Sequence, residues 1–425
     1  MLSIFHVSRV DNALSAPLLK VNGYLIAYSK HKAWHYFLYF LLMLFCIYVT
    51  SRYNGDGNKQ VVKRSRMLGK YCCLVSWIGM LFHSAFAVAI VDLSKPELKT
   101  PVFSQLTTEN GLSQDTINVL HVDNQGFLWL GTDTGLNRYD GYRVEAIEPE
   151  GTALGAKTIN DLWQDSHENL WIATFSAGVF KLDLTTGKAT RVDARKSQVI
   201  PDWQQGANAF AEDETGNIWI AFDEDVLTYD GPTNALNTVF SMSQARIEKG
   251  YFIRTLMWSG DLLYIGTSEG LLVYSRSQQK TVDLGFLFAG FANDDQKNVK
   301  TLYVDASRDR LMIGTVKGLY TLSLAQIEQF VTQGTQPEPL STLIESRNIW
   351  RIRSTDNSLF YLPTDQGIYT YDAQSQQISH LLRPTDSRLL LSKDVIYDVG
   401  FDGKQNLWLG TRSDGALHWM RTSQV

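Results

Sequence analysis

Short apolar runs with a period of two alternate with turn residues through most of the chain. That period is the one expected of a half-buried β-strand. Between the first two runs of residues 116–147, Asp123 can accept turn amides and Gly126 tolerates a positive φ. We therefore predict a hairpin here, within a segment of four strands. The runs are Asn118 to Val122, Phe127 to Gly131, Leu136 to Tyr139 and Tyr142 to Ile147.

This pattern recurs, with an aromatic or large apolar anchor in its second strand. Seven copies begin at Thr116, Thr158, Gly206, Phe252, Asn298, Asn348 and Val395. Their anchors are Trp129, Trp171, Trp219, Tyr264, Met312, Tyr361 and Trp408, separated by 42 to 49 residues. That spacing suits one four-stranded blade per copy. The sequence thus predicts an all-β fold, a single seven-bladed β-propeller of four-stranded blades over residues 101–422.

A strand outside the copies is available to close the ring. The last copy holds three apolar runs, whereas residues 102–106 precede the first copy and have no blade of their own. Because an open strand edge invites aggregation, we predict that residues 102–106 form the outermost strand of the last blade.

The repeat resembles a known family. The run from Phe103 to Ser113, followed by copies of D-x-x-G-x-L-W-L-G-T-x-x-G-L-x-R-Y-D-G, resembles the two-component regulator propeller repeats of bacterial sensor proteins over residues 102–422. Copies four to six depart from the pattern: Tyr264, Met312 and Tyr361 replace the Trp, and Pro363 replaces a Gly. We expect less regular blades there, in the same fold.

The N-terminal region contains two apolar stretches, Trp34 to Thr50 and Tyr71 to Ile90, and predicts one or two apolar helices before the propeller. The loop between them is basic, which places residues 91 onward across the membrane. Alternatively, translation starts at Met67, and residues 67–90 are a signal peptide with a small-residue site near Ala87. Residues 1–66 are then an extension that is not translated. Both interpretations predict a periplasmic propeller, free or anchored to the inner membrane.

Charge and cysteine content exclude several classes of function. Residues 88–425 carry 29 Lys plus Arg against 42 Asp plus Glu, a formal charge of minus 13, which argues against nucleic-acid partners. The three cysteines all precede residue 88, so the propeller has no thiolate metal site, disulfide or cysteine nucleophile. Gly266 to Gly270 matches G-x-S-x-G, but it occupies a repeat turn and not a strand-to-helix elbow. We predict no catalytic residues, metal or cofactor.

The between-blade loops differ most among the copies, and such loops share a face around the channel. Their aromatic and basic residues are candidates for ligand binding: Trp203, Arg246, Lys249, Tyr251 and Arg347. Aromatic rings and guanidinium groups suit stacking on sugars or pairing with acidic ligands.

The family resemblance implies a sensory propeller that binds a small molecule, frequently a carbohydrate, and signals to a histidine kinase or diguanylate cyclase module. The sequence shows no kinase, cyclase or receiver pattern, so we expect output from a separate partner or a C-terminal module missing from this chain. Two alternatives stay open: an envelope propeller enzyme, such as a lyase, and a pure protein-interaction scaffold.

Overall fold

The computed structural model describes residues 102–149, 152, 154–192, 206–292, 294–382 and 395–420, and the backbone of 4–5, 18–21 and 24–27. The chain forms two compact units, Met1–Lys99 and Thr100–Val425. In the first, β1 (Ile4–Phe5), β2 (Leu18–Val21) and β3 (Tyr24–Ala27) form an antiparallel sheet. The predicted apolar helices at 34–50 and 71–90 lie outside the described residues. None of the helices in the described ranges is long and apolar enough to cross a membrane.

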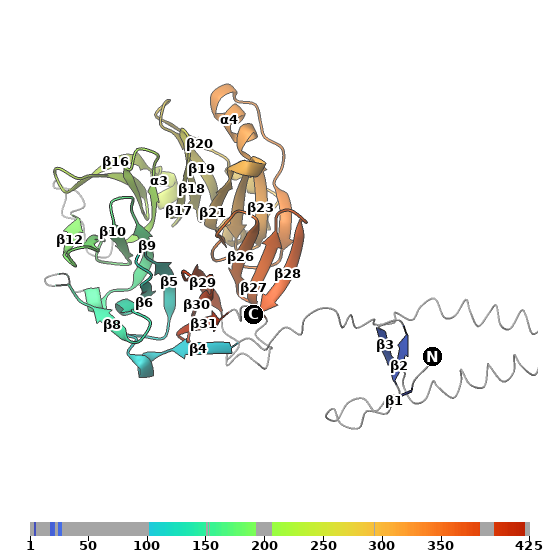
Figure 1. Cartoon of the computed structure of the whole chain (residues 1–425). Helices are drawn as coiled ribbons and strands as arrows, with labels where there is room; N and C mark the ends of the chain where they lie inside the picture. Colours follow the sequence, from blue (N-terminus) through green and yellow to red (C-terminus); the bar gives the residue numbers. More distant parts are fainter. Residues whose placement is uncertain are drawn as a thin grey trace, which may run out of the picture. The chain divides into compact units, whose positions relative to one another are not determined.

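The second unit is a ring of seven four-stranded antiparallel blades, which confirms the predicted propeller (Figure 1). Blade one contains β5 (Ile117–Val122), β6 (Leu128–Thr132), β7 (Gly135–Tyr139) and β8 (Val144–Ile147). Blade two contains β9 (Ile159–Gln164), β10 (Asn169–Thr174), β11 (Val179–Asp183) and β12 (Ala189–Val192). Blade three contains β13 (Ala207–Glu212), β14 (Ile218–Phe222), β15 (Asp225–Asp230) and β16 (Ala235–Ser241). Blade four contains β17 (Ile253–Ser259), β18 (Leu262–Thr267), β19 (Gly270–Ser275) and β20 (Lys280–Asp283). Blade five contains β21 (Val299–Asp305), β22 (Arg310–Thr315), β23 (Gly318–Ser323) and β24 (Ser341–Glu345).

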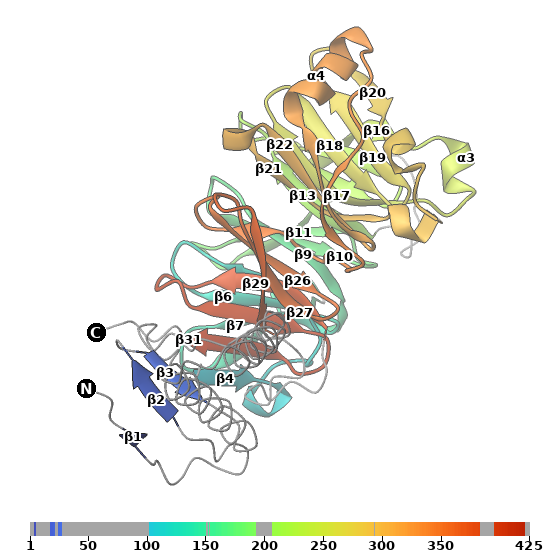
Figure 2. The same ribbon diagram turned by 90° about the vertical axis from the view of Figure 1, so that its right-hand side faces the viewer.

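Blade six contains β25 (Arg353–Ser354), β26 (Leu359–Thr364), β27 (Gly367–Asp372) and β28 (Gln377–Leu382). Blade seven contains β29 (Ile396–Phe401), β30 (Leu407–Thr411), β31 (Ala416–Met420) and β4 (Val102–Leu106). β4 pairs with β31, so the first strand of the ring is the outermost strand of its last blade. The first strand of each blade is innermost, and β29, β5, β9, β13, β17 and β21 contact one another in turn around the channel. The helix α4 (Leu324–Gln333) joins β23 to β24 and lies at the edge of the ring in Figures 1 and 2.

Each regular blade is held by an aspartate between its first two strands. Asp123 accepts backbone N–H groups of Gln125 and Phe127 at 3.0 and 2.9 Å, as the turn pattern predicts. Its other oxygen accepts the indole N–H of the anchor Trp129 at 2.8 Å. Asp165 and Asp213 bind the anchors of the next two blades in the same way. The anchor tryptophan is therefore buried with its polar atom satisfied.

Glycine after the anchor lets neighbouring blades approach closely. A Cβ on Gly131 would lie 2.6 Å from Val119 Cγ1 and 2.7 Å from Ile159 Cγ2 in the next blade. Pro363 occupies this place in blade six and has no N–H to give to the ladder. The innermost strand of that blade, β25, accordingly shrinks to two residues. The irregularity expected in copies four to six is thus found in blade six, whereas the innermost strands of blades four and five keep seven residues each.

Candidate functional site

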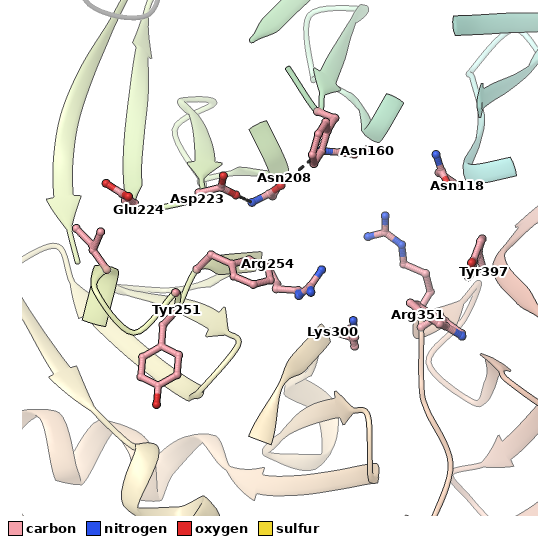
Figure 3. Close-up of a pocket in the computed structure, with 15 residues that line it drawn as sticks. Asn118, Asn160, Asn208, Asp223, Glu224, Tyr251, Arg254, Lys300, Arg351 and Tyr397 are labelled. Atoms are coloured by element: carbon pink, nitrogen blue, oxygen red, sulfur yellow. Dashed lines mark hydrogen bonds between the residues drawn. The ribbon is translucent and has the colours of Figure 1, made fainter. Parts of the chain in front are cut away.

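One position of the repeat is turned toward the mouth of the central channel in every blade. In six innermost strands the register shifts around the second residue, so that this residue forms a bulge, and a bulge re-aims its side chain. In blade six the equivalent residue follows Ile349, which forms an isolated bridge to Thr364. The seven residues are Asn118, Asn160, Asn208, Arg254, Lys300, Trp350 and Tyr397, and all line one cavity of about 670 Å³ (Figure 3).

The first three members of this ring fasten the blades together. Each asparagine donates its side-chain N–H to a carbonyl of the next innermost strand: Asn118 to Ile159 at 3.2 Å, Asn160 to Ala207 at 2.9 Å and Asn208 to Ile253 at 2.8 Å. A buried amide that bridges two strands in this way has a structural role. Among the other four residues, Arg254, Lys300 and Trp350 donate no such hydrogen bond within the described part of the chain, so the ring contains both structural residues and residues available for another task.

Two of these residues, Arg254 and Lys300, are cations without a salt bridge, although the charge of Asp223 acts on Arg254. Arg254 and Lys300 form no salt bridge or side-chain hydrogen bond within the described part of the chain, and Arg254 Nε is buried without a partner. The Arg254 guanidinium lies 4.2 Å from the Phe252 ring centroid, and Lys300 Nζ lies 5.0 Å from that of Trp350. Burial, and then the charge of Arg254, lower the pKa of Lys300 to about 8. Burial also lowers the pKa of Arg254.

A third cation of the cavity is already paired. Arg351 Nη2 of blade six lies 3.0 Å from Asp161 Oδ1 of blade two. Burial raises the pKa of Asp161 despite the nearby charges of Arg351 and Arg353. The free cationic groups at the channel mouth are therefore those of blades four and five.

Aromatic rings complete the cavity. Trp350 and Tyr397 pack edge to face with their centroids 4.8 Å apart, and Trp350 Nε1 is buried without a hydrogen-bond partner among the described residues. Phe175, in the turn after β10, is 66% exposed and lies at the rim. Tyr251 and Phe252 come from the loop after α3 (Gln244–Ile247). The loops between blades and the turns between second and third strands thus share this face, as expected.

The acids of the cavity lie on the blade-three side. Asp223 and Glu224 occupy the turn between β14 and β15, and Asp223 Oδ1 accepts a hydrogen bond from Asn208 at 2.8 Å. Across the described ranges, no group of three or more His, Cys, Asp or Glu residues is placed to hold a metal. The cavity combines unpaired cations, ring faces and a few polar groups, which is the composition of a small-molecule site.

Of the five residues chosen from the sequence, four lie in the described ranges, and Tyr251 is the one of those four that lines this cavity. Arg246 is paired with Asp283 and lies 3.7 Å from Glu269. Lys249 Nζ lies 5.8 Å from the Tyr251 ring centroid, and Arg347 Nε donates to Tyr369 at 3.1 Å. Trp203 lies outside the described residues. Ligand contact by any of the five stays a prediction.

The bulge residues were missed, although the aligned copies hold a signal for them. They occupy the third position of each copy, where Asn, Asn, Asn, Arg, Lys, Trp and Tyr follow one another. A column that changes from one residue type to several, beside an anchor column that stays aromatic or large and apolar, marks positions released from the shared structural role. In G-x-S-x-G, by contrast, Ser268 Oγ accepts the backbone N–H of Phe252 at 3.0 Å and serves the turn.

Comparison with known proteins agrees with this architecture. Residues 111–134 match the family model described as two component regulator propeller. The ring is similar to the extracellular domain of the putative hybrid two component system BT3049 from B. thetaiotaomicron, with 20% identity, a TM-score of 0.60, and coverage of 76% of this chain and 42% of that one. It is also similar to PorZ, a surface component of the type-IX secretion system of Porphyromonas gingivalis, with 15% identity, a TM-score of 0.56, and coverage of 73% and 47%.

A third similar structure is an inactive virginiamycin B lyase from Staphylococcus aureus, with 11% identity, a TM-score of 0.54, and coverage of 75% of this chain and 99% of the lyase. Comparison with the curated proteins gave no match. The chain spans less than half the length of the two surface proteins above. At these identities the structures show a shared fold. The family match covers residues 111–134, in the first blade and its approach, and it agrees with the resemblance of the repeat to two-component regulator propellers.

Proposed function

We propose that the propeller is the extracytoplasmic sensory module of a two-component-type signalling protein, and that it binds a small molecule at the channel mouth. The observation that carries this proposal is the division of the bulge ring. Three members fasten blades, whereas Arg254, Lys300 and Trp350 present to the same cavity two cations without a salt bridge and an indole N–H without a hydrogen-bond partner among the described residues. Groups without a structural partner are unfavourable in a folded protein unless a ligand uses them.

The comparisons support the signalling context. The first blade carries a two component regulator propeller repeat, and a similar fold occurs in the extracellular domain of a putative hybrid two component system. We assign the output chemistry to a partner signalling protein or a further module, because ligand binding in the channel mouth supplies no phosphoryl transfer. The proposed location is the periplasm.

An enzyme remains the second candidate, because the ring matches nearly the whole length of a lyase. No histidine is among the residues that line the cavity, so acid–base catalysis there would depend on Lys300, tyrosine or carboxylate groups. We favour binding without conversion.

The test is a thermal-shift screen of the full chain against neutral and acidic small molecules, with chromatography of every compound that binds. We expect at least one compound to raise the melting temperature and to be recovered unchanged. Trp350→Ala and Tyr397→Ala should each abolish the shift. Tyr142→Ala should retain it, because Tyr142 is 96% exposed in the turn between β7 and β8, at the other end of the strands.

The proposal is wrong if no compound binds, or if binding survives both cavity variants while circular dichroism shows native folds. Conversion of the compound would establish the enzyme instead.

A further inference from the structure

Two like charges meet in the cavity, and neither forms a salt bridge with an acid among the described residues. Arg254 and Lys300 hold equivalent positions in neighbouring blades, and both project into the cavity (Figure 3). Bringing two cations together in a partly buried site is unfavourable, because solvent screens them less there than at the surface. The repeat does not require it, since blades one to three place asparagine at this position.

Nearby carboxylates relieve this repulsion only in part, since Asp223 acts on Arg254 through its charge alone. Asp223 forms no salt bridge with Arg254, and its Oδ1 accepts the Asn208 amide. Asp161 is bound to Arg351, the remaining cation that lines the cavity. Asp223 and Glu224 also come from one turn of blade three, so the negative and positive groups come from different blades of the ring.

From this distribution, and building on the proposed function, we infer that the ligand is an anion whose carboxylate, sulfate or phosphate group binds between Arg254 and Lys300. The planar guanidinium suits two oxygens of such a group, and the ammonium adds a point charge. The carboxylates of Asp223 and Glu224 repel the anionic end of the ligand, which orients that end toward blades four and five.

The aromatic groups define the part of the ligand next to its charge. Trp350 lies beside Lys300, with the ammonium 5.0 Å from the indole ring centroid, and its Nε1 is buried without a partner among the described residues. An indole in this setting offers a ring face and one N–H donor. The ligand class is therefore an acid with a ring or apolar body that carries a hydrogen-bond acceptor.

The experiment measures binding of defined anions to the full chain by calorimetry and thermal shift at constant ionic strength. The probes are inorganic phosphate, sulfate and benzoate, and benzamide is the neutral counterpart of benzoate. We expect at least one anion to bind, and benzoate to bind more tightly than benzamide. A response to phosphate and sulfate alone would identify an inorganic or phosphorylated ligand, and a preference for benzoate a carboxylic acid.

Variants locate the anion. Arg254→Gln and Lys300→Gln should each weaken binding about tenfold or more, since a hydrogen bond to a charged group is worth that much. Arg412→Gln and Lys404→Gln remove exposed cations outside the cavity and should leave affinity within about twofold. Arg254→Lys keeps the charge and should retain part of the affinity.

The inference is overturned if no anion binds, or if the Gln variants at 254 and 300 bind as tightly as the wild type. A neutral compound that binds, needs Trp350 and ignores both cations would overturn the anion assignment while leaving the sensory proposal intact.

Discussion

Arg353 of blade six holds Asp398 of blade seven through two hydrogen bonds, with Nε 3.0 Å from Oδ1 and Nη2 2.8 Å from Oδ2. Asp398 also accepts the backbone N–H of Leu120 in blade one at 3.1 Å. One carboxylate thus links three blades across the closure of the ring, where the bridging asparagines are absent. Burial opposes the charge of Asp398, but the neighbouring guanidinium groups and these hydrogen bonds outweigh it and lower the pKa of Asp398.

Asp398→Asn should therefore destabilise the propeller by about 3 kcal/mol, because it leaves a partly buried guanidinium without its counter-charge. Chemical denaturation at pH 7 measures the change. Because the folded-state pKa is lowered, the contribution of Asp398 is present above the unfolded pKa near 4 and is lost as pH falls through the folded value. Glu109→Gln, at an exposed acid, is the control. Equal stabilities of Asp398→Asn and the control would show that the pair does not hold the closure.

Lys300 should lower the stability of the ring at neutral pH. Its folded-state pKa of about 8 lies below the ordinary value of 10.5. Below pH 8 the lysine is charged in both states, so the folded state carries the full cost of burying that charge beside Arg254. Between pH 8 and 10.5 the lysine loses its proton in the folded state but keeps it in the unfolded state. The free energy of unfolding of the wild type therefore rises relative to that of a variant without the amine.

Lys300→Met should consequently raise the melting temperature at pH 7, and the difference should shrink as pH approaches 10. Lys404→Met, at an exposed lysine in a turn, should have little effect at either pH. A Lys300→Met variant less stable than the wild type at pH 7 would contradict the view that this lysine is retained for binding.

Gly131 should tolerate no methyl group, although blades two and three carry Ala173 and Ala221 at the equivalent position. Gly131→Ala places a Cβ 2.6 Å from Val119 Cγ1 and should cost about 1 to 3 kcal/mol by overpacking. Gly403→Ala is the matched control, since nothing lies within 4 Å of its added Cβ. Urea denaturation measures the free energy of unfolding of both variants. Equal stabilities would mean that neighbouring blades can separate without loss.

The turn aspartates should respond to acid. Burial raises the pKa of Asp213, but hydrogen bonds from Thr215, Trp219 and Asn217 together outweigh it and lower this pKa to about 2. The stability that the carboxylate adds is then present above about pH 4 and disappears as pH falls toward 2. Asp213→Asn should melt below the wild type at pH 6, with a smaller gap at pH 2.5. Glu214→Gln, in the same turn, should show no such convergence.

Much of the fold could be predicted because the same pattern of apolar strands and turn residues recurs seven times along the chain. The anchors at Trp129 and Trp408 sit in fully buried second strands, and their spacing revealed the blade count. The pairing of β4 with β31 could be anticipated because residues 102–106 had no other partner. The helix α4 lies within a variable connection that carries no repeat signal.

The site was harder to predict because it depends on a backbone irregularity. In the sequence, Arg254 and Lys300 alternate with apolar neighbours, as the solvent-facing residues of an ordinary strand do. The register shift beside each of them turns their side chains into the channel mouth, and that shift has no sequence code of its own. Residues of the between-blade connections were predicted instead, such as Arg246, which lies in α3 and is paired with Asp283.

The most direct test of the account is a crystal structure of the chain with the tightest-binding compound from the screen. We predict electron density in the cavity at the channel mouth, with an acidic group of the compound within hydrogen-bond distance of Arg254 and Lys300 and its body against Trp350. Density for the compound elsewhere, with this cavity empty, would contradict the claim that the divided ring of bulge residues is the ligand site.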